Sequence, residues 1–121
     1  MGLDMYAYST TDDISDVDCD EPSDSVKLQY WRKHPNLHGW MERLYRKKGG
    51  RAEDFNLVPV LLTEADLATL HADVIADRLP ETVGFFFGTS RPEEKQDDLD
   101  FIQKARAAIA EGKKVFYTSS W

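Results

Sequence analysis

The stretch "SVKLQYWRKHPNLHGWMERLYRKKGG", residues 25–50, decides the fold because its apolar pattern changes period inside it. Residues 25–31 alternate in polarity, which predicts a strand, and from Pro35 onward apolar residues recur every three or four positions, which predicts a helix. Proline suits the first turn of a helix, and Gly49-Gly50 is typical of its end. The apolar face of this helix consists of Leu37, Trp40, Met41 and Leu44.

Similar patterns predict the remaining elements. Further strands are expected at residues 2–9, 55–62, 82–88 and 114–121, and Pro59 favours either an edge strand or the start of a strand in the second of these. Two more helices are expected, one after Thr63 and one that opens at Ser90 and ends at Gly112. Their apolar stripes are Leu67, Leu70, Val74 and Ile75 in the first, and Leu99, Ile102, Ala105 and Ile109 in the second.

The helix after Thr63 has the best-defined start. Asp66 stands three residues after Thr63, as in a capping box, and Leu62 and Leu67 occupy the positions of a hydrophobic staple. Taken together, the elements predict a single α+β domain over residues 1–121, with a mixed or antiparallel sheet of about five strands and three helices.

Charge is distributed unevenly along the 121 residues, whose formal net charge is −7. Residues 1–24 hold eight acids and no base, residues 25–51 hold eight bases and one acid, and the remainder is acidic again. We expect an acidic solvated loop at about residues 10–24. The acidic field disfavours direct nucleic-acid binding, whereas the basic segment permits a local anion site.

Cysteine usage and hydropathy suggest a compartment. Cys19 is the only cysteine, which permits no internal disulfide, and no apolar run approaches the roughly 20 residues that span a membrane. The N-terminus lacks the basic head and apolar run of a signal peptide. We therefore expect a cytoplasmic protein that does not enter the membrane.

Trp31, Arg32 and Lys33 stand where a predicted strand meets a predicted helix. Backbone N–H groups at a helix start can meet an anion, arginine adds charged donors, and tryptophan offers a flat face for stacking. Together they suit a nucleotide or another phosphorylated ligand. The alternative is that Trp40 belongs to the core, Trp31 is partly buried and the two cations are ordinary strand-end charges.

Histidine chemistry has two interpretations. His34 and His38 are four residues apart, but Pro35 begins the helix between them, so no metal site is expected, and no cofactor. His38 can serve as a general acid or base, or can simply form a hydrogen bond at the helix edge. No sequence motif for nucleophilic catalysis is present, and the acidic run Asp97, Asp98 and Asp100 is expected on a solvated helical turn without chemistry.

Five short motifs stand out: "MGLDMY" at residues 1–6, "YWRK" at 30–33, "LHGW" at 37–40, "GFFFG" at 84–88 and "SSW" at 119–121. This combination resembles a family of small uncharacterised phage and prophage proteins over nearly the whole chain. The resemblance implies expression inside a bacterial host. It draws attention to the motif positions Asp4, Tyr6, Trp31, Arg32, Lys33, His38, Trp40, Ser119, Ser120 and Trp121.

The leading functional hypothesis is a phage-type accessory protein that modulates host processes or counters host defence. It would bind either a host protein, through the acidic loop, or a nucleotide-like anionic ligand, in one shallow pocket formed by the motif positions. The alternative is a small enzyme that acts on a phosphorylated or nucleotide substrate, with His38 as acid or base and Arg32 as charge clamp.

Overall fold

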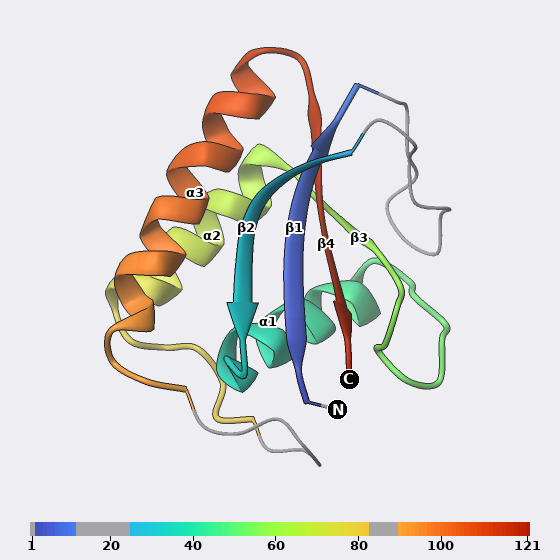
Figure 1. Ribbon diagram of the computed structural model, residues 1–121, viewed down its shortest axis with the longest axis vertical. Coiled ribbons are helices and arrows are strands. Elements are labelled where there is room, and N and C mark those ends of the chain that lie inside the picture. The colour runs from blue at the N-terminus through green and yellow to red at the C-terminus, as the bar shows by residue number, and fades with distance from the viewer. Residues whose placement is uncertain (1, 12–24, 83–89) are drawn as a thin grey trace.

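The computed structural model describes residues 2–11, 25–82 and 90–121, and Figure 1 shows how they are arranged. The elements in chain order are β1 (Asp4–Thr10), β2 (Val26–Arg32), α1 (Pro35–Lys47), β3 (Val60–Leu62), α2 (Glu64–Ile75), α3 (Glu94–Ala110) and β4 (Lys114–Ser120). A single α+β domain with three helices is therefore confirmed. The described residues contain four strands where about five were expected, and the strand predicted at 82–88 falls almost wholly on residues 83–89, outside the described ranges.

The four strands form one antiparallel sheet in the order β2-β1-β4-β3. The first and last strands of the chain are thus neighbours, with Met5 opposite Ser119. β1 also pairs with β2, and a bulge shifts the register between Ala7 and Tyr8. β3 lies at the sheet edge and begins after Pro59, as expected for a residue that lacks an N–H donor, although this strand is shorter than the predicted range of 55–62.

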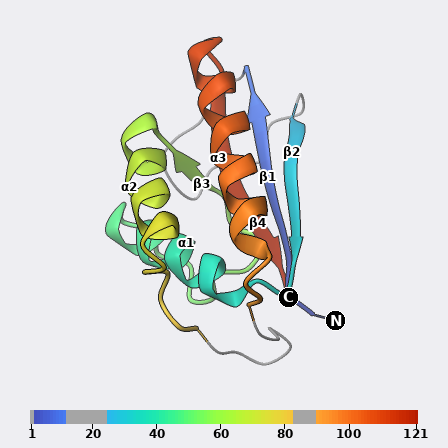
Figure 2. The ribbon, with the colours of Figure 1, turned by 90° about the vertical axis from the view of Figure 1, so that its left-hand side faces the viewer.

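All three helices cover the same face of the sheet, as Figure 2 shows. Alternate residues of β1 point toward them, and Leu3, Met5 and Ala7 are fully buried. Trp31 joins this layer from β2, and its ring meets Phe101 of α3 edge-on at 5.0 Å between ring centroids. The main hydrophobic core therefore lies between the sheet and the helices. None of the described helices has the length and apolar character needed to cross a membrane.

Helices α1 and α2 begin where the sequence predicted. Pro35 is the first residue of α1. At the start of α2, the Thr63 hydroxyl accepts a hydrogen bond from the Asp66 N–H at 3.2 Å, and Asp66 Oδ2 accepts one from the Thr63 N–H at 2.9 Å. This reciprocal capping box is confirmed, and such a cap is worth about 1 kcal/mol. The predicted stripe was wrong at Ile75, which is 50% exposed.

Helix α3 corrects the predicted start and face. The helix begins at Glu94 with Glu93 at the N-cap position, three residues later than the expected start at Ser90, and Ser90 does not cap it. Leu99 and Ile109 are only half-buried. The buried positions are Glu94, Asp98, Phe101, Ile102, Ala105 and Ala108. Two acidic side chains therefore continue the buried apolar face into the first turns of the helix.

Candidate functional site

The ten motif positions do not form one pocket, because they lie on both sides of the sheet. Asp4, Tyr6, Arg32 and Ser120 share the face opposite the helices. There, Asp4 Oδ1 accepts hydrogen bonds from the Tyr30 hydroxyl at 2.6 Å and from Arg32 Nη1 at 3.0 Å. The hydrogen bond to Asp4 is the main cause that raises the pKa of Tyr30.

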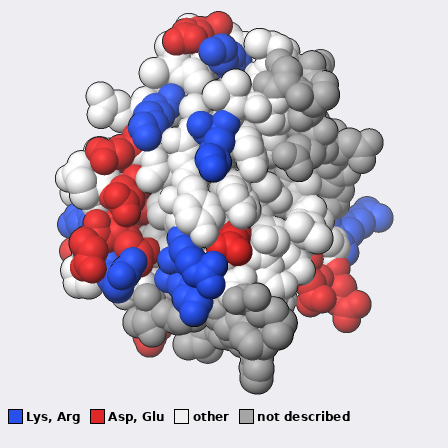
Figure 3. All heavy atoms as spheres, viewed as in Figure 1, with Lys and Arg blue, Asp and Glu red and all other residues white. Residues whose placement is uncertain are grey.

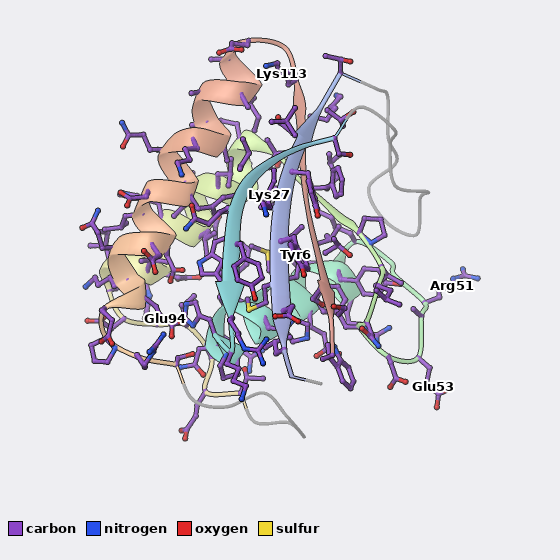
Figure 4. All side chains as sticks on the ribbon, viewed as in Figure 1. Tyr6, Lys27, Arg51, Glu53, Glu94 and Lys113 are labelled. Atoms are coloured by element: carbon purple, nitrogen blue, oxygen red, sulfur yellow. The ribbon has the colours of Figure 1, made fainter. Side chains whose placement is uncertain are left out.

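This face is aromatic at its centre. The Tyr6 ring lies 5.3 Å from that of Tyr30 and 6.1 Å from that of Tyr8. In Figure 4, Tyr6 and Lys27 lie over the strands on this face. Figure 3 shows separate groups of basic atoms across the face and acidic atoms gathered at its left edge, near α3. Lys33, which directly follows the last residue of β2, is exposed and has a positive φ of 57°.

The other motif residues lie on the inner side. Trp31 is 3% exposed, His38 1% and Ser119 2%, while Trp40 reaches 9%. Trp121 is half-buried, and its indole N–H donates to the Phe55 carbonyl at 2.8 Å. The β1, β2 and β4 segments do meet, as predicted, but the alternation of strand residues sends their motif side chains to opposite faces.

His38 belongs to the core. Its Nδ1 lies 2.7 Å from the Tyr117 hydroxyl, and its ring contacts that of Phe55 with centroids 5.0 Å apart. Burial lowers the pKa of His38 from 6.5 to about 4, and burial raises the pKa of Tyr117 well above 10. His38 is therefore buried and hydrogen-bonded inside the protein, which favours the simple hydrogen-bonding interpretation of this residue over the role of acid or base.

His34, four residues earlier, has polar surroundings. It is 3% exposed and serves as the N-cap residue of α1. Its Nε2 lies 2.9 Å from Asp98 Oδ2, and its Nδ1 lies 2.7 Å from the Ser90 hydroxyl. Asp98 Oδ1 also accepts a hydrogen bond from the Trp31 indole N–H at 3.0 Å. A chain of hydrogen bonds thus runs from Ser90 through His34 and Asp98 to Trp31.

A second carboxylate faces the same ring. Glu94 Oε2 lies 3.0 Å from His34 Nδ1, but it has no hydrogen-bonding geometry to any partner in the described part of the chain. Glu94 is 4% exposed and Asp98 1%. Burial raises the pKa of Asp98, and the His34 hydrogen bond opposes that shift. Both carboxylates therefore lie within 3.0 Å of a nitrogen of the His34 ring.

The His34 cluster opens onto a cavity of about 230 Å³, which we call the His34 cavity. It lies between the starts of α1 and α3 and the end of α2. Polar residues on its lining are His34, Asn36, Asp77, Ser90, Arg91, Lys95 and Asp98, and apolar ones are Val74, Leu79 and Pro92. Near its rim, Arg91 Nε lies 3.3 Å from Glu94 Oε1, and Lys95 Nζ lies 3.3 Å from Asp77 Oδ1.

This cluster was not predicted from the sequence. Asp98 was expected on a solvated turn, whereas it is buried beside His34. A signal was present in the spacing, because Asp98 and Glu94 stand one and two turns, respectively, before Phe101 and Ile102 on the same helical face. The meeting of His34 with Ser90 had no local signal, since 56 positions separate them.

A second cavity, of about 280 Å³, lies between α1 and α2, and we call it the Trp40 cavity. Its lining is Trp40, Arg43, Leu44, Lys47, Asp66, Thr69, Asp73, Arg78 and Pro80. The indole N–H of Trp40 donates to Asp73 Oδ2 at 2.9 Å, and Arg78 Nη2 lies 3.2 Å from Asp73 Oδ1. Asp66 is held by Lys48, with Nζ and Oδ2 2.6 Å apart.

Residues 77–80 form the wall between the two cavities. Asp77 and Leu79 line the His34 cavity, while Arg78 and Pro80 line the Trp40 cavity. Arg43 and Lys47 have no ion-pair partner within the described ranges, and both are exposed at the Trp40 cavity. The Trp40 cavity thus has a surplus of cations, whereas the His34 cavity has two buried carboxylates beside His34 and exposed ion pairs only near its rim.

Residues 2–11, 25–82 and 90–121 contain no group of three histidine, cysteine or acidic side chains placed to hold a metal ion. No family model, curated protein or solved structure matches the chain.

Proposed function

We propose that the protein binds a small anionic, nucleotide-like ligand in the Trp40 cavity. The observation that supports this most directly is the unpaired charge of Arg43 and Lys47, which share one face of α1 with Trp40 and border a preformed cavity. Surface cations without a carboxylate partner are free to bind a phosphate. Binding a ligand there requires no existing ion pair of these two residues to break.

The size and walls of the cavity fit such a ligand. Its volume of about 280 Å³ is just below that of the cavities which hold drug-sized molecules, so we expect a ligand no larger than a mononucleotide. Trp40 and Leu44 supply apolar surface, and Arg78 can exchange Asp73 for a phosphate because exposed ion pairs are weak. The sequence predicted a nucleotide-like ligand beside Trp31 and Arg32. We propose instead that this ligand binds at the following helix, α1, in the Trp40 cavity.

Capture of a host protein, the other role that the resemblance suggests, would depend on the acidic segment. Residues 12–24 lie outside the described residues, whereas the contacts that support the small-ligand role lie within them. The phage context, the host modulation and the cytoplasmic location remain predictions that rest on the resemblance and on the sequence.

The proposal is tested by titrating the protein with adenosine 5′-monophosphate while following amide NMR shifts and calorimetric heat. Adenosine, which lacks the phosphate, and inorganic phosphate separate the contributions of base and anion. We expect shifts on α1 and the end of α2, and an affinity that weakens with salt because the phosphate replaces counterions.

A pair of double variants locates the site. Arg43→Ala/Lys47→Ala removes both free cations, and we expect the affinity for the nucleotide to fall at least about tenfold, as for two lost charge-assisted contacts. Lys27→Ala/Lys114→Ala removes the same charge from exposed strand positions and is the matched control. If neither the nucleotide nor phosphate shifts α1, or if both double variants weaken binding equally, the Trp40 cavity is not the ligand site.

A further inference from the structure

We propose that Ser90, His34 and Asp98 form a catalytic site in the His34 cavity that hydrolyses a small ester carrying an anionic group. This activity goes beyond ligand binding in the Trp40 cavity and does not depend on it, because residues 77–80 separate the two cavities. The inference rests on three connected contacts, on their burial and on the access that the cavity gives to Ser90.

The contacts have the order that nucleophilic catalysis requires. The Ser90 hydroxyl lies 2.7 Å from His34 Nδ1, and His34 Nε2 lies 2.9 Å from Asp98 Oδ2. A nucleophile, a base and a group that orients the base therefore stand in hydrogen-bond reach of one another. In serine proteases the hydroxyl meets Nε2 and the carboxylate meets Nδ1. Here the two ring nitrogens exchange roles, and the proton transfer is equally possible because either nitrogen can accept while the other donates.

The Asp98 carboxylate sets the direction of these hydrogen bonds. Because a carboxylate only accepts, the neutral His34 ring carries its proton on Nε2 and donates it to Asp98, which leaves Nδ1 to accept from the Ser90 hydroxyl. The Asn36 backbone N–H donates to the Ser90 oxygen at 3.1 Å. Trp31 holds the other oxygen of Asp98 from the core side. Asp98 is thus a positioning residue, since it orients the imidazole and stabilises its charged form.

Glu94 lies where it can stabilise the charge that the His34 ring gains during the reaction. When the ring takes the Ser90 proton, its new charge lies close to Glu94, whose Oε2 is 3.0 Å from His34 Nδ1 and has no hydrogen bond in the described part of the chain. Glu94 therefore stabilises the charged ring through proximity of opposite charge, without a hydrogen bond to it. Stabilisation that appears only as charge develops is what accelerates a reaction.

The cavity defines the substrate class. Ser90 and His34 line it together with Val74, Leu79 and Pro92, which offer apolar contact to an acyl group. A volume of about 230 Å³ limits that group to a short chain. Arg91 is 66% exposed and Lys95 40%, so either can release its acidic partner and bind an anionic substituent at the rim.

The reaction balances with water as the only co-reactant. Ser90 Oγ bonds to the ester carbonyl carbon while its proton passes to His34 Nδ1. The bond to the leaving oxygen then breaks, that oxygen takes the proton from His34, and the alcohol departs from acyl-Ser90. Water attacks the same carbon and gives a proton to His34; the acyl–Oγ bond breaks, Ser90 recovers its proton and the carboxylic acid leaves.

The start of α1 lies where negative charge would develop. The Asn36 N–H belongs to the first turn of this helix and already lies within 3.1 Å of Ser90 Oγ. An oxygen on the carbon bonded to Oγ would come within its reach, and the helix N-terminus favours negative charge. The same element that orients Ser90 thus supplies a donor to the oxyanion.

The test uses two chromogenic esters, neutral 4-nitrophenyl acetate and anionic 4-nitrophenyl hemisuccinate, on the full chain. We expect release of 4-nitrophenolate above the buffer rate, with preference for the anionic ester, and an acyl group on the Ser90 peptide after rapid acid quench and mass spectrometry. Ser90→Ala should lower the turnover at least about 100-fold. Thr118→Ala, which removes a half-buried hydroxyl from β4, is the matched control and should retain the rate.

The variant Asp98→Asn tests whether Asp98 orients the His34 ring for the reaction or only fills space beside it. We expect kcat to fall at least about tenfold with KM within about threefold of its original value, because the ring loses its orientation while the cavity keeps its shape. Circular dichroism checks that each variant is folded. The proposal is overturned if neither ester is turned over above the buffer rate, if Ser90→Ala retains the original rate, or if the acyl group is found only on other residues. Nucleotide binding is measured on the same samples, so either proposal can fail alone.

Discussion

The two cavities differ in where they place their charges. In the Trp40 cavity the cations are at the surface, and Arg78, whose side chain is 62% exposed, pairs with Asp73 across solvent. In the His34 cavity a histidine and two carboxylates are withdrawn from water, each less than 5% exposed. Exposed charges cost little and can exchange partners, which suits binding. Buried charges are expensive to desolvate and keep their partners, which suits a fixed chemical arrangement.

The largest expected effect tests this contrast through stability. His34→Ala removes the group that lies between Asp98 and Glu94 and leaves both carboxylates buried without it. Leaving a buried carboxylate without its hydrogen-bond donor costs at least about 3 kcal/mol, whereas removing one partner of an exposed pair costs below about 1 kcal/mol. We therefore expect urea unfolding to show the larger loss for His34→Ala and the smaller one for Arg78→Ala. Equal losses in the two variants would mean that burial does not distinguish the cavities.

A histidine without carboxylates provides the second test. His38 is buried against Tyr117 and Phe55, and burial lowers its pKa from 6.5 to about 4. Below pH 6.5 the unfolded chain takes up a proton at this position that the folded protein does not. The free energy of unfolding therefore falls as the pH decreases from 6.5 to 4, by about 3 kcal/mol from this residue alone.

His38→Gln serves as the reference for this pH dependence, because it keeps a polar partner for Tyr117 and cannot titrate. The difference between the two stability curves over pH 4–6.5 isolates His38 from the other acidic groups, Asp98 included. Parallel curves would show that His38 titrates normally and is not closed off in the core.

The sequence predicted the parts of this molecule that depend on local pattern. Alternation placed β1 and β2, the change of period placed α1, and Thr63 with Asp66 placed the start of α2. Trp40 was predicted on the apolar face of the first helix, and it is a buried residue of α1.

The sites themselves depend on contacts between distant segments. Asp98 comes 64 positions after His34, and nothing near either residue indicates that the other will cover it. The acidic run on α3 was interpreted as solvated because lone carboxylates are seldom buried, and a histidine partner is what makes the exception. The predicted pocket failed for a different reason: its residues are close in the sheet, but their side chains alternate between its two faces.

The smallest expected effect on the free energy of unfolding comes from two single variants, each of which replaces a tryptophan by phenylalanine. Trp31→Phe and Trp40→Phe each delete an indole N–H that donates to a carboxylate, at 3.0 Å to Asp98 and at 2.9 Å to Asp73. Asp98 is buried and cannot replace that donor with water, so we expect a loss of about 2 kcal/mol in the free energy of unfolding. Asp73 is half-buried and keeps Arg78, so Trp40→Phe should cost about 1 kcal/mol. Both variants lose the same ring volume. The difference between their free energies of unfolding, measured with urea, therefore reflects how deeply each carboxylate is buried. A greater cost for Trp40→Phe would reverse the assignment of the buried and exposed charges on which the comparison depends.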